Sequence, residues 1–336
     1  MHDTPSSRIA AILAALLIAG CGGGGSGGIA FPLLPAPEPS PPPEPTVEVG
    51  GAVDSPASYT VAELAARPAT TMAVTYASGS GEQTRTYTGA NLWSLLSDSG
   101  LQTDPSRRND LNSRYVLATG SDGYRAVFSL GELDPSLGNR ESLVAYATVI
   151  DGQSQPLPES DGPFRVTAPG DVKGGRYVSN LIRLDVRASG ATAEGSGGGL
   201  SPSFRVSGAV LTEASFDIDA LRGLAATTVT VGTDEYKGVS LWALLDHLKL
   251  RLPEDIKNPT LSMYAVATAT DNYRALLSLG EVDPGFGNNG TIVAYEINGQ
   301  ELDRNGMARL VVPGDLRRSR SVSNLIAIEV LVAEGP

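Results

Sequence analysis

The stretch Tyr115–Asn139, YVLATGSDGYRAVFSLGELDPSLGN, occurs a second time as Tyr264–Asn288, YAVATATDNYRALLSLGEVDPGFGN. The two stretches are identical at 15 of 25 positions, and a constant offset of 149 residues (264 minus 115) separates them. Unrelated segments of this length share far fewer residues. The chain therefore contains an internal duplication, and each copy should be one structural unit.

The similarity extends beyond this stretch on both sides. Upstream, Tyr87–Leu96 matches Tyr236–Leu245 at the same offset. Downstream the offset falls to 144 residues (309 minus 165), and two pairs of segments match there: Arg165–Asp171 with Arg309–Asp315, and Val178–Ile182 with Val322–Ile326. A unit of this length exceeds a solenoid repeat, so we expect two tandem globular domains, residues 47–188 and 204–334. Residues 189–203, rich in Gly, Ser and Ala, are the predicted linker.

Composition limits the classes of function. The chain has 336 residues, a formal net charge of −12 and a pI of about 4.7. Nucleic-acid binding is excluded as a partner class, since it depends on Lys and Arg that neutralise phosphates. The only cysteine is Cys21, so no intramolecular disulfide and no cysteine-based zinc site is expected. His2 lies in the predicted signal, and His247 is predicted to lie on the surface of a helix, so the folded part has no pair of histidines for a metal or catalytic site.

The N-terminus resembles an export signal. Ile9–Gly20 is an apolar run of 12 residues, too short to span a bilayer but suited to the apolar core of a secretory signal. It leads directly into Cys21, an arrangement that resembles a bacterial lipoprotein signal over residues 1–21, with Cys21 as the lipidated residue. The glycine- and proline-rich residues 22–46 are then a tether to a membrane. Gly22 after the cysteine favours the outer over the inner membrane, with the protein facing the periplasm or the cell surface.

Strands dominate the predicted secondary structure. Short alternating segments separated by glycine turns recur in both copies, whereas the predicted helices are few and short. Thr60 with Glu63 forms a capping box, and Asn91 and Ser240 are predicted N-caps of helices with a leucine stripe. The expected fold class is α+β, built as two strand-rich domains.

Acidic side chains recur at equivalent positions of the two copies. Asp122, Glu132 and Asp134 have Asp271, Glu281 and Asp283 as their counterparts. Such oxygens could bind a hard cation or act as an acid–base pair. The competing interpretation is that the carboxylates cap backbone amides in a turn-rich loop, and we favour it because the loop carries Gly131, Pro135 and Gly138.

A basic loop follows each Pro-Gly-Asp sequence, against the overall charge. The loop contains Lys173 and Arg176 in the first copy. In the second copy it contains Arg317, Arg318 and Arg320, and an upstream arginine, Arg165 or Arg309, precedes each loop. Because arginine can bind a phosphate through two parallel hydrogen bonds, these loops are candidate anion sites. The alternative is a solvated loop.

Taken in order, these motifs resemble the molybdopterin-binding domain of the sulfite oxidase superfamily. The motifs are Tyr87–Leu96, Asp122–Tyr124, Ala145–Tyr146, Arg165–Asp171 and Arg176–Asn180, and the second copy repeats them with Asn272 in place of a glycine. The resemblance implies a mixed fold rich in strands and a molybdenum atom held on a pyranopterin, with a cysteine thiolate as a further ligand of the metal.

It also implies a set of residues near the pterin phosphate. These are Arg165, Arg176 and Ser179 in the first copy, and Arg309, Arg320 and Ser323 in the second. Ser179 and Ser323 stand where larger family members have a lysine. Neither copy contains a cysteine that could ligate the metal.

The sequence therefore predicts a lipid-anchored, extracytoplasmic protein with two degenerate domains of this type. We expect a non-catalytic binding or accessory protein whose partners are a membrane and an anionic small molecule. The alternative is a molybdopterin-dependent oxidoreductase, or an electron-transfer accessory that binds the pterin cofactor.

Overall fold

Two five-stranded sheets form the first repeat in the computed structural model, which describes residues 43–335. Cys21, the signal and most of the predicted tether therefore lie outside the described residues. The first sheet has the order β2 (Ala57–Thr60), β1 (Thr46–Gly51), β10 (Leu181–Ala188), β5 (Arg114–Gly120) and β6 (Arg125–Ser129). The second has the order β3 (Ala69–Ser78), β4 (Gly81–Asn91), β7 (Leu143–Ile150) and β8 (Gln153–Pro156), and β9 (Arg165–Val166) also pairs with β7.

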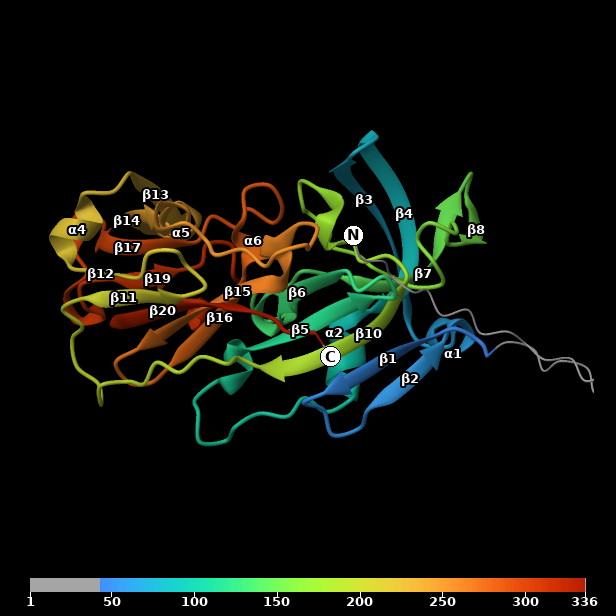
Figure 1. The fold of residues 1–336 in the computed structure, drawn as a ribbon, viewed down its shortest axis with the longest axis horizontal. Helices are drawn as coiled ribbons and strands as arrows, with labels where there is room; N and C mark the ends of the chain where they lie inside the picture. The colour runs from blue at the N-terminus through green and yellow to red at the C-terminus, as the bar shows by residue number, and fades with distance from the viewer. Residues whose placement is uncertain (1–42, 336) are drawn as a thin grey trace, which may run out of the picture. The chain divides into compact units, whose positions relative to one another are not determined.

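The second repeat has the same strand order. Its first sheet runs β12 (Ala214–Phe216), β11 (Phe204–Gly208), β20 (Leu325–Val332), β15 (Met263–Ala269) and β16 (Arg274–Ser278). Its second sheet runs β13 (Ala226–Val231), β14 (Asp234–Ser240), β17 (Ile292–Ile297) and β18 (Gln300–Glu301), with β19 (Arg309–Val311) on β17. The predicted strand-rich α+β architecture is confirmed, with one pair of sheets for each half of the duplication (Figure 1).

All helices of the described chain are short. The α-helices are α1 (Val61–Ala65), α2 (Leu92–Asp98), α3 (Leu130–Leu133), α4 (Ile218–Arg222), α5 (Leu241–Leu248) and α6 (Leu279–Val282). The 3-10 turns are η1 (Asp110–Ser113), η2 (Gly174–Arg176), η3 (Pro259–Ser262), η4 (Asp303–Asn305) and η5 (Arg318–Arg320). The predicted caps are present: Thr60 and Glu63 form the capping box, and Asn91 and Ser240 accept from backbone amides. No helix among these residues has the length and apolar character needed to cross a membrane.

Strand alternation gives each repeat two buried faces. On β5, Val116 and Ala118 point into the core between the two sheets of the first repeat. Tyr115 and Leu117 point the other way, because successive side chains of a strand lie on opposite faces. The outer face of β5 and β6 therefore needs its own cover.

The second repeat provides that cover. A third apolar core consists of three pairs of equivalent residues and one further residue from near the C-terminus: Tyr115 and Tyr264, Leu117 and Val266, Val127 and Leu276, with Ala333. The rings of Tyr115 and Tyr264 are 4.6 Å apart between centroids. Residues from Glu44 onward accordingly form one compact unit rather than two separate bodies.

The predicted linker is held against the second repeat. The Glu329 carboxylate accepts hydrogen bonds from the Thr192 amide (2.9 Å), the Thr192 hydroxyl (2.8 Å) and the Ala193 amide (2.9 Å). Arg274 donates to the Ala191 carbonyl at 3.0 Å. The linker thus adds ordered contacts between the repeats.

One difference between the repeats is large. The hairpin of β3 and β4 has strands of ten and eleven residues, whereas β13 and β14 have six and seven. The first hairpin extends past the rest of its sheet (Figure 1). Ala77, near the tip of the hairpin, forms an isolated parallel β-bridge with Lys173. The extension forms a wall that the second repeat lacks.

Candidate functional site

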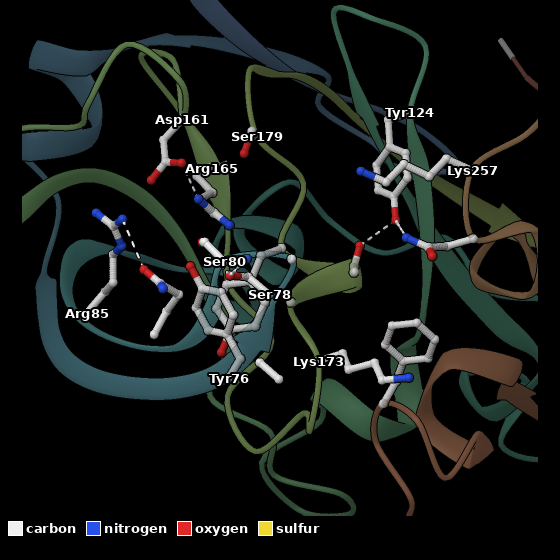
Figure 2. A pocket seen from close by; sticks show the side chains of 18 of the residues that line it. Tyr76, Ser78, Ser80, Arg85, Tyr124, Asp161, Arg165, Lys173, Ser179 and Lys257 are labelled. Carbon is white, nitrogen blue, oxygen red and sulfur yellow. Dashed lines mark hydrogen bonds and ion pairs between the residues drawn. The ribbon is translucent and has the colours of Figure 1, made fainter.

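The longer hairpin borders the main pocket of the described chain (Figure 2). The pocket has a volume of about 690 Å³. Its walls are the tip of the β3–β4 hairpin, the loop from Lys173 to Ser179, and three residues of the second repeat, Lys257, Asn258 and Phe286. The pocket therefore belongs to the first repeat and is completed by the second.

Arg165 lies in this pocket inside a cage of tyrosines. Its guanidinium carbon is 5.8 Å from the ring centre of Tyr76, 5.7 Å from that of Tyr87 and 5.5 Å from that of Tyr177. Cations are attracted to aromatic faces at such distances. Arg165 also forms an ion pair with Asp161, which accepts a hydrogen bond from the Tyr87 hydroxyl at 3.3 Å. One cation is thus held rigidly at a wall of the pocket.

Two polar groups of the cage have no partner. The Arg165 Nε and the Tyr177 hydroxyl are buried and form no hydrogen bond within the described chain. Burial raises the pKa of Tyr177 and of Tyr87 well above the ordinary value for a phenol, so both remain neutral donors at physiological pH. Buried donors without a partner are costly. Both atoms are almost fully covered by protein, so a ligand would reach them only after a side-chain shift.

The rim adds further positive charge. Arg85, Lys173 and Lys257 line the opening, and the two lysines form no ion pair among residues 43–335. The carboxylates of the lining are Asp122 and Asp161, and Asp161 is engaged by Arg165. Four cations against two carboxylates make this pocket locally positive in an acidic protein, which favours anions.

Two glycines let aromatic rings of the pocket wall pack against the backbone. A Cβ on Gly174 would lie 2.6 Å from the Tyr76 ring, and one on Gly175 would lie 2.5 Å from the Phe286 ring. The second repeat has Arg318 and Ser319 at the equivalent positions. Larger residues there would displace the wall, so the two glycines are needed for this arrangement.

The equivalent region of the second repeat has a different lining. Arg318 extends into it, donates to the Tyr236 hydroxyl at 3.2 Å and pairs with Asp234 at 2.9 Å. Arg309 donates to the Asn305 side chain at 3.2 Å and lies 6.0 Å from the Tyr236 ring centre. Ser323 and Arg318 line the equivalent cavity, of about 550 Å³, but Arg309 is not part of its lining. The second repeat thus does not bring its predicted residues together.

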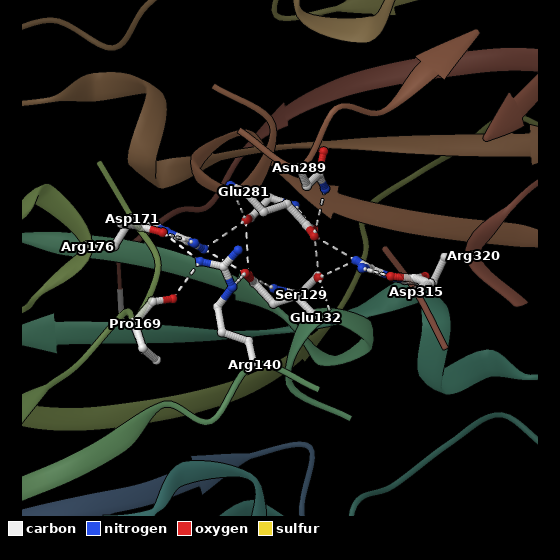
Figure 3. Close-up of polar contacts among 11 residues, drawn as sticks. Ser129, Glu132, Arg140, Pro169, Asp171, Arg176, Glu281, Asn289, Asp315 and Arg320 are labelled. Atoms are coloured by element: carbon white, nitrogen blue, oxygen red, sulfur yellow. Dashed lines mark hydrogen bonds and ion pairs between the residues drawn. The ribbon is translucent and has the colours of Figure 1, made fainter. Parts of the chain in front are cut away.

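Arg176 and Arg320 lie elsewhere, at the boundary between the repeats (Figure 3). Arg176 is fully buried and donates to Asp171 twice at 2.7 Å and to Glu132 at 2.8 Å. Arg320, 2% exposed, donates to Asp315 at 2.9 and 2.6 Å and to Glu281 at 2.7 Å.

This placement corrects the expectation that each basic loop presents all its arginines to an anion. Of the first copy's predicted residues, Arg165 and Ser179 line the pocket, whereas the Arg176 guanidinium is already paired with two carboxylates. The same pairing removes Arg320 from any surface site. Their positions do not support contact with a cofactor.

The acidic positions serve partly as caps. Glu132 and Glu281 complete capping boxes with Ser129 and Ser278 at the starts of α3 and α6, and Asp134 accepts from the Ser136 amide at 2.7 Å. The capping interpretation is confirmed for these residues. Sequence reasoning missed their second role, since the remaining oxygens of Glu132 and Glu281 pair with the buried arginines.

Sequence reasoning also missed the aromatic part of the pocket. Tyr76 comes from the hairpin extension, and the unequal lengths of the segments 69–91 and 226–240 were the available signal. His247 is exposed on α5, as expected, and is not part of the pocket lining.

The molybdenum centre implied by the resemblance does not fit these residues. A thiolate ligand is required, and residues 43–335 contain no cysteine. The same residues hold no cluster of three or more His, Cys, Asp or Glu side chains placed to bind a metal ion. The phosphate end of a pterin is compatible with Arg165 and the rim lysines, but the metal is not.

Comparison with known proteins gives one family match. The family model described as the oxidoreductase molybdopterin binding domain matches residues 207–335, which is the second repeat. A search of the curated proteins finds no match. Among solved structures, the chain is similar to the sulfane dehydrogenase SoxCD from Paracoccus pantotrophus, with 12% identity, a TM-score of 0.35, and coverage of 84% of this chain and 77% of that one. The family match supports the resemblance for the second repeat.

Proposed function

We propose that this protein is a non-catalytic binding protein of the molybdopterin-binding-domain type, and that its first repeat binds a small phosphorylated anion. The observation that carries the proposal is the pocket around Arg165, where a fixed guanidinium, two partnerless donors and a basic rim meet. Arg165 would attract the anion, and the rim cations would neutralise its remaining charge. Export and a lipid anchor at Cys21 remain part of the proposal, supported by the N-terminal sequence alone.

The pocket chemistry suits an anion that carries an aromatic ring. Tyr76 and Tyr177 are tilted against each other with centroids 4.3 Å apart, and Phe286 also lines the pocket. Aromatic walls favour a flat ring beside the phosphate through stacking. A phosphorylated pterin has both features, so binding of the metal-free pterin belongs to the same proposal.

The alternative is a molybdopterin-dependent oxidoreductase or an electron-transfer accessory. The family match to residues 207–335 favours it. The absence of a cysteine from residues 43–335 disfavours it, since the metal would have no thiolate ligand. Assay of molybdenum content and pterin fluorescence separates the two, in protein expressed with its own signal in a host that makes the cofactor.

A binding experiment tests the main proposal. Inorganic phosphate, pyrophosphate and a phosphorylated pterin are each titrated while thermal unfolding is followed. A ligand at a hundred times its dissociation constant stabilises the fold by about 2.7 kcal/mol. The shift should weaken as salt is added, because the rim charges are exposed and screened.

Variants assign the effect to the pocket. The double variant Lys173→Gln/Lys257→Gln removes two exposed rim charges that form no ion pair, so the fold should tolerate it. Lys249→Gln is the control, an exposed lysine that is not part of the pocket lining and whose only ionic partner in the described chain is the exposed Asp246. Loss of the ligand shift in the double variant alone is expected. Equal shifts in both variants, or no shift for any ligand at millimolar concentration, would refute the proposal.

A further inference from the structure

The two repeats provide an internal comparison at their shared boundary. Arg140 of the first repeat donates to Asp171 Oδ1 at 2.7 Å and to the Pro169 carbonyl at 3.0 Å, and its Nε lies 3.7 Å from Glu132. Asp171 Oδ1 thereby accepts from two guanidinium groups, since Arg176 Nη2 also donates to it at 2.7 Å. These three acceptors form a complete guanidinium site.

The second repeat contains the same acceptors without the guanidinium. Glu281, Pro313 and Asp315 are the counterparts of Glu132, Pro169 and Asp171, but Asn289 stands where the first repeat has Arg140. Of these three acceptors, the Asn289 amide donates only to Glu281, at 3.2 Å, while its oxygen accepts from Thr291. Asp315 Oδ1 accepts from Arg320 alone, at 2.6 Å.

A cavity lies where the missing side chain would be. It has a volume of about 240 Å³ and lies across the boundary between the repeats. Three carboxylates and two arginines line it, together with four uncharged residues: Glu132, Gly138, Arg140, Glu281, Asn289, Pro313, Gly314, Asp315 and Arg320. Since a water occupies about 30 Å³ in the liquid, the space exceeds that of a single water and can take a group of several heavy atoms. The Glu281 and Asp315 carboxylates are buried at its floor, whereas Gly314 is exposed and Asn289 half-buried at its rim.

The charges around the boundary do not balance. In the first repeat, Glu132 and Asp171 face Arg140 and Arg176. In the second, Glu281 and Asp315 face Arg320 only, so one negative charge is left over.

The pKa values of Glu281 and Glu132 differ in direction because of this difference in charge. Burial, opposed by Arg320 and reinforced by Glu132, raises the pKa of Glu281. Glu132 is equally buried, yet Arg176 and Arg140 hold its pKa below the ordinary value. The same position thus has opposite electrostatics in the two repeats because one has a second arginine.

We propose that this cavity binds a small guanidinium-type cation, in the place that Arg140 occupies in the first repeat. The cation donates to Asp315 Oδ1, to the Pro313 carbonyl and to Glu281, which are the equivalents of the groups that Arg140 contacts. Binding supplies the missing positive charge to two carboxylates that folding has already desolvated. The attraction is therefore stronger than for a pair formed in water.

The shape of the site favours a planar guanidinium group over a compact ammonium group. Asp315 and Glu281 are already held in position by Arg320, so no side chain has to be ordered on binding. A guanidinium can donate to several acceptors in one plane, as Arg140 does. Methylammonium should bind the same cavity more weakly.

Titration of the whole protein with methylguanidinium tests the proposal. Binding is monitored through chemical-shift changes in NMR spectra. Wild-type protein should show saturable shifts confined to residues near Asn289, and methylammonium should shift the same signals at higher concentration. Asn289→Arg should eliminate the saturable response, because the new side chain fills the cavity as Arg140 does. Asn289→Gln, which adds no charge, should retain it.

The variants also separate filling of the cavity from damage to the fold. Asn289→Arg should unfold at a higher temperature than the wild type, whereas Asn289→Gln should not. Should Asn289→Arg fold poorly, Asn289→Lys serves as a second charged replacement with the same expected loss of response. Identical titration curves for the wild type and a folded charged variant, or no saturable response in the wild type, overturn the proposal. Neither outcome bears on the anion pocket around Arg165.

Discussion

Replacing Arg320 by methionine should destabilise the whole molecule. The Arg320 side chain is 2% exposed and donates to Asp315, Glu281 and Ser129. Its removal leaves two buried carboxylates without a counter-charge, and breaking a buried ion pair in this way costs about 3–5 kcal/mol. Ser129 and Glu281 belong to different repeats and are hydrogen-bonded to each other, so the loss of stability should weaken the contact between the two repeats.

Arg318→Met is the matched control. Arg318 lies two residues away in the same turn, but its side chain is 46% exposed and its main ionic partner is Asp234. Exposed ion pairs contribute about 0–1 kcal/mol. The free energy of unfolding of both variants is measured in urea. Unfolding is monitored by tryptophan fluorescence, since Trp93 packs in the first repeat and Trp242 in the second.

The pH dependence provides a second readout. Burial already raises the pKa of Glu281 and Arg320 opposes that shift, so loss of Arg320 should raise this pKa further. A group with a raised pKa destabilises the fold when ionised, so the penalty is present at neutral pH and disappears as the pH falls below the raised pKa. Equal stability of the two variants, or an Arg320→Met penalty that does not change with pH, would refute the reasoning.

Three further predictions follow from the same structure. At neutral pH, Glu281→Gln should cost little or stabilise the fold, because the raised pKa of Glu281 makes its charged form unfavourable. Glu132→Gln should destabilise the fold and remove a stabilisation that the wild type loses as the pH falls through the lowered pKa of Glu132. Urea unfolding from pH 8 down to well below the ordinary pKa of a glutamate checks both. Fragments 47–187 and 204–333 should each associate or unfold at lower temperature than the whole chain, since separation exposes the apolar core that joins the repeats, and monomeric fragments of full stability in sedimentation and melting experiments would contradict this. Cys21→Ser should release the protein from the membrane fraction, and an unchanged distribution with unchanged mature mass would reject the lipid anchor.

The sequence alone was sufficient for features that depend on neighbouring residues. The duplication predicted two halves of the same kind, and the halves have the same strand order. Thr60, Asn91 and Ser240 cap helices as expected, because a cap joins groups only three residues apart. The low helix content followed from the same local patterns.

The environment of each arginine depended on the tertiary structure. Arg165 and Arg176 lie 11 residues apart (176 minus 165) within one motif, yet one lines a pocket and the other is fully buried at the boundary between repeats. A basic residue after a turn is exposed or buried according to what packs over it. Here the covering surface comes from residues about a hundred positions away, such as Ser278.

The two carboxylate oxygens of Glu132 show the same contrast between local and tertiary interactions. Its Oε1 accepts from the Ser129 amide, which a local motif predicts, and its Oε2 pairs with Arg176, which no local motif contains. Likewise, the residues of the pocket were visible in the sequence, but their convergence was not, since Tyr76, Arg165 and Lys257 come from three distant segments. The sequence determined which side chains were available and their local conformation. Only packing of the two repeats decided which charges were desolvated together, because the free energy of a buried charge depends on all the groups that surround it.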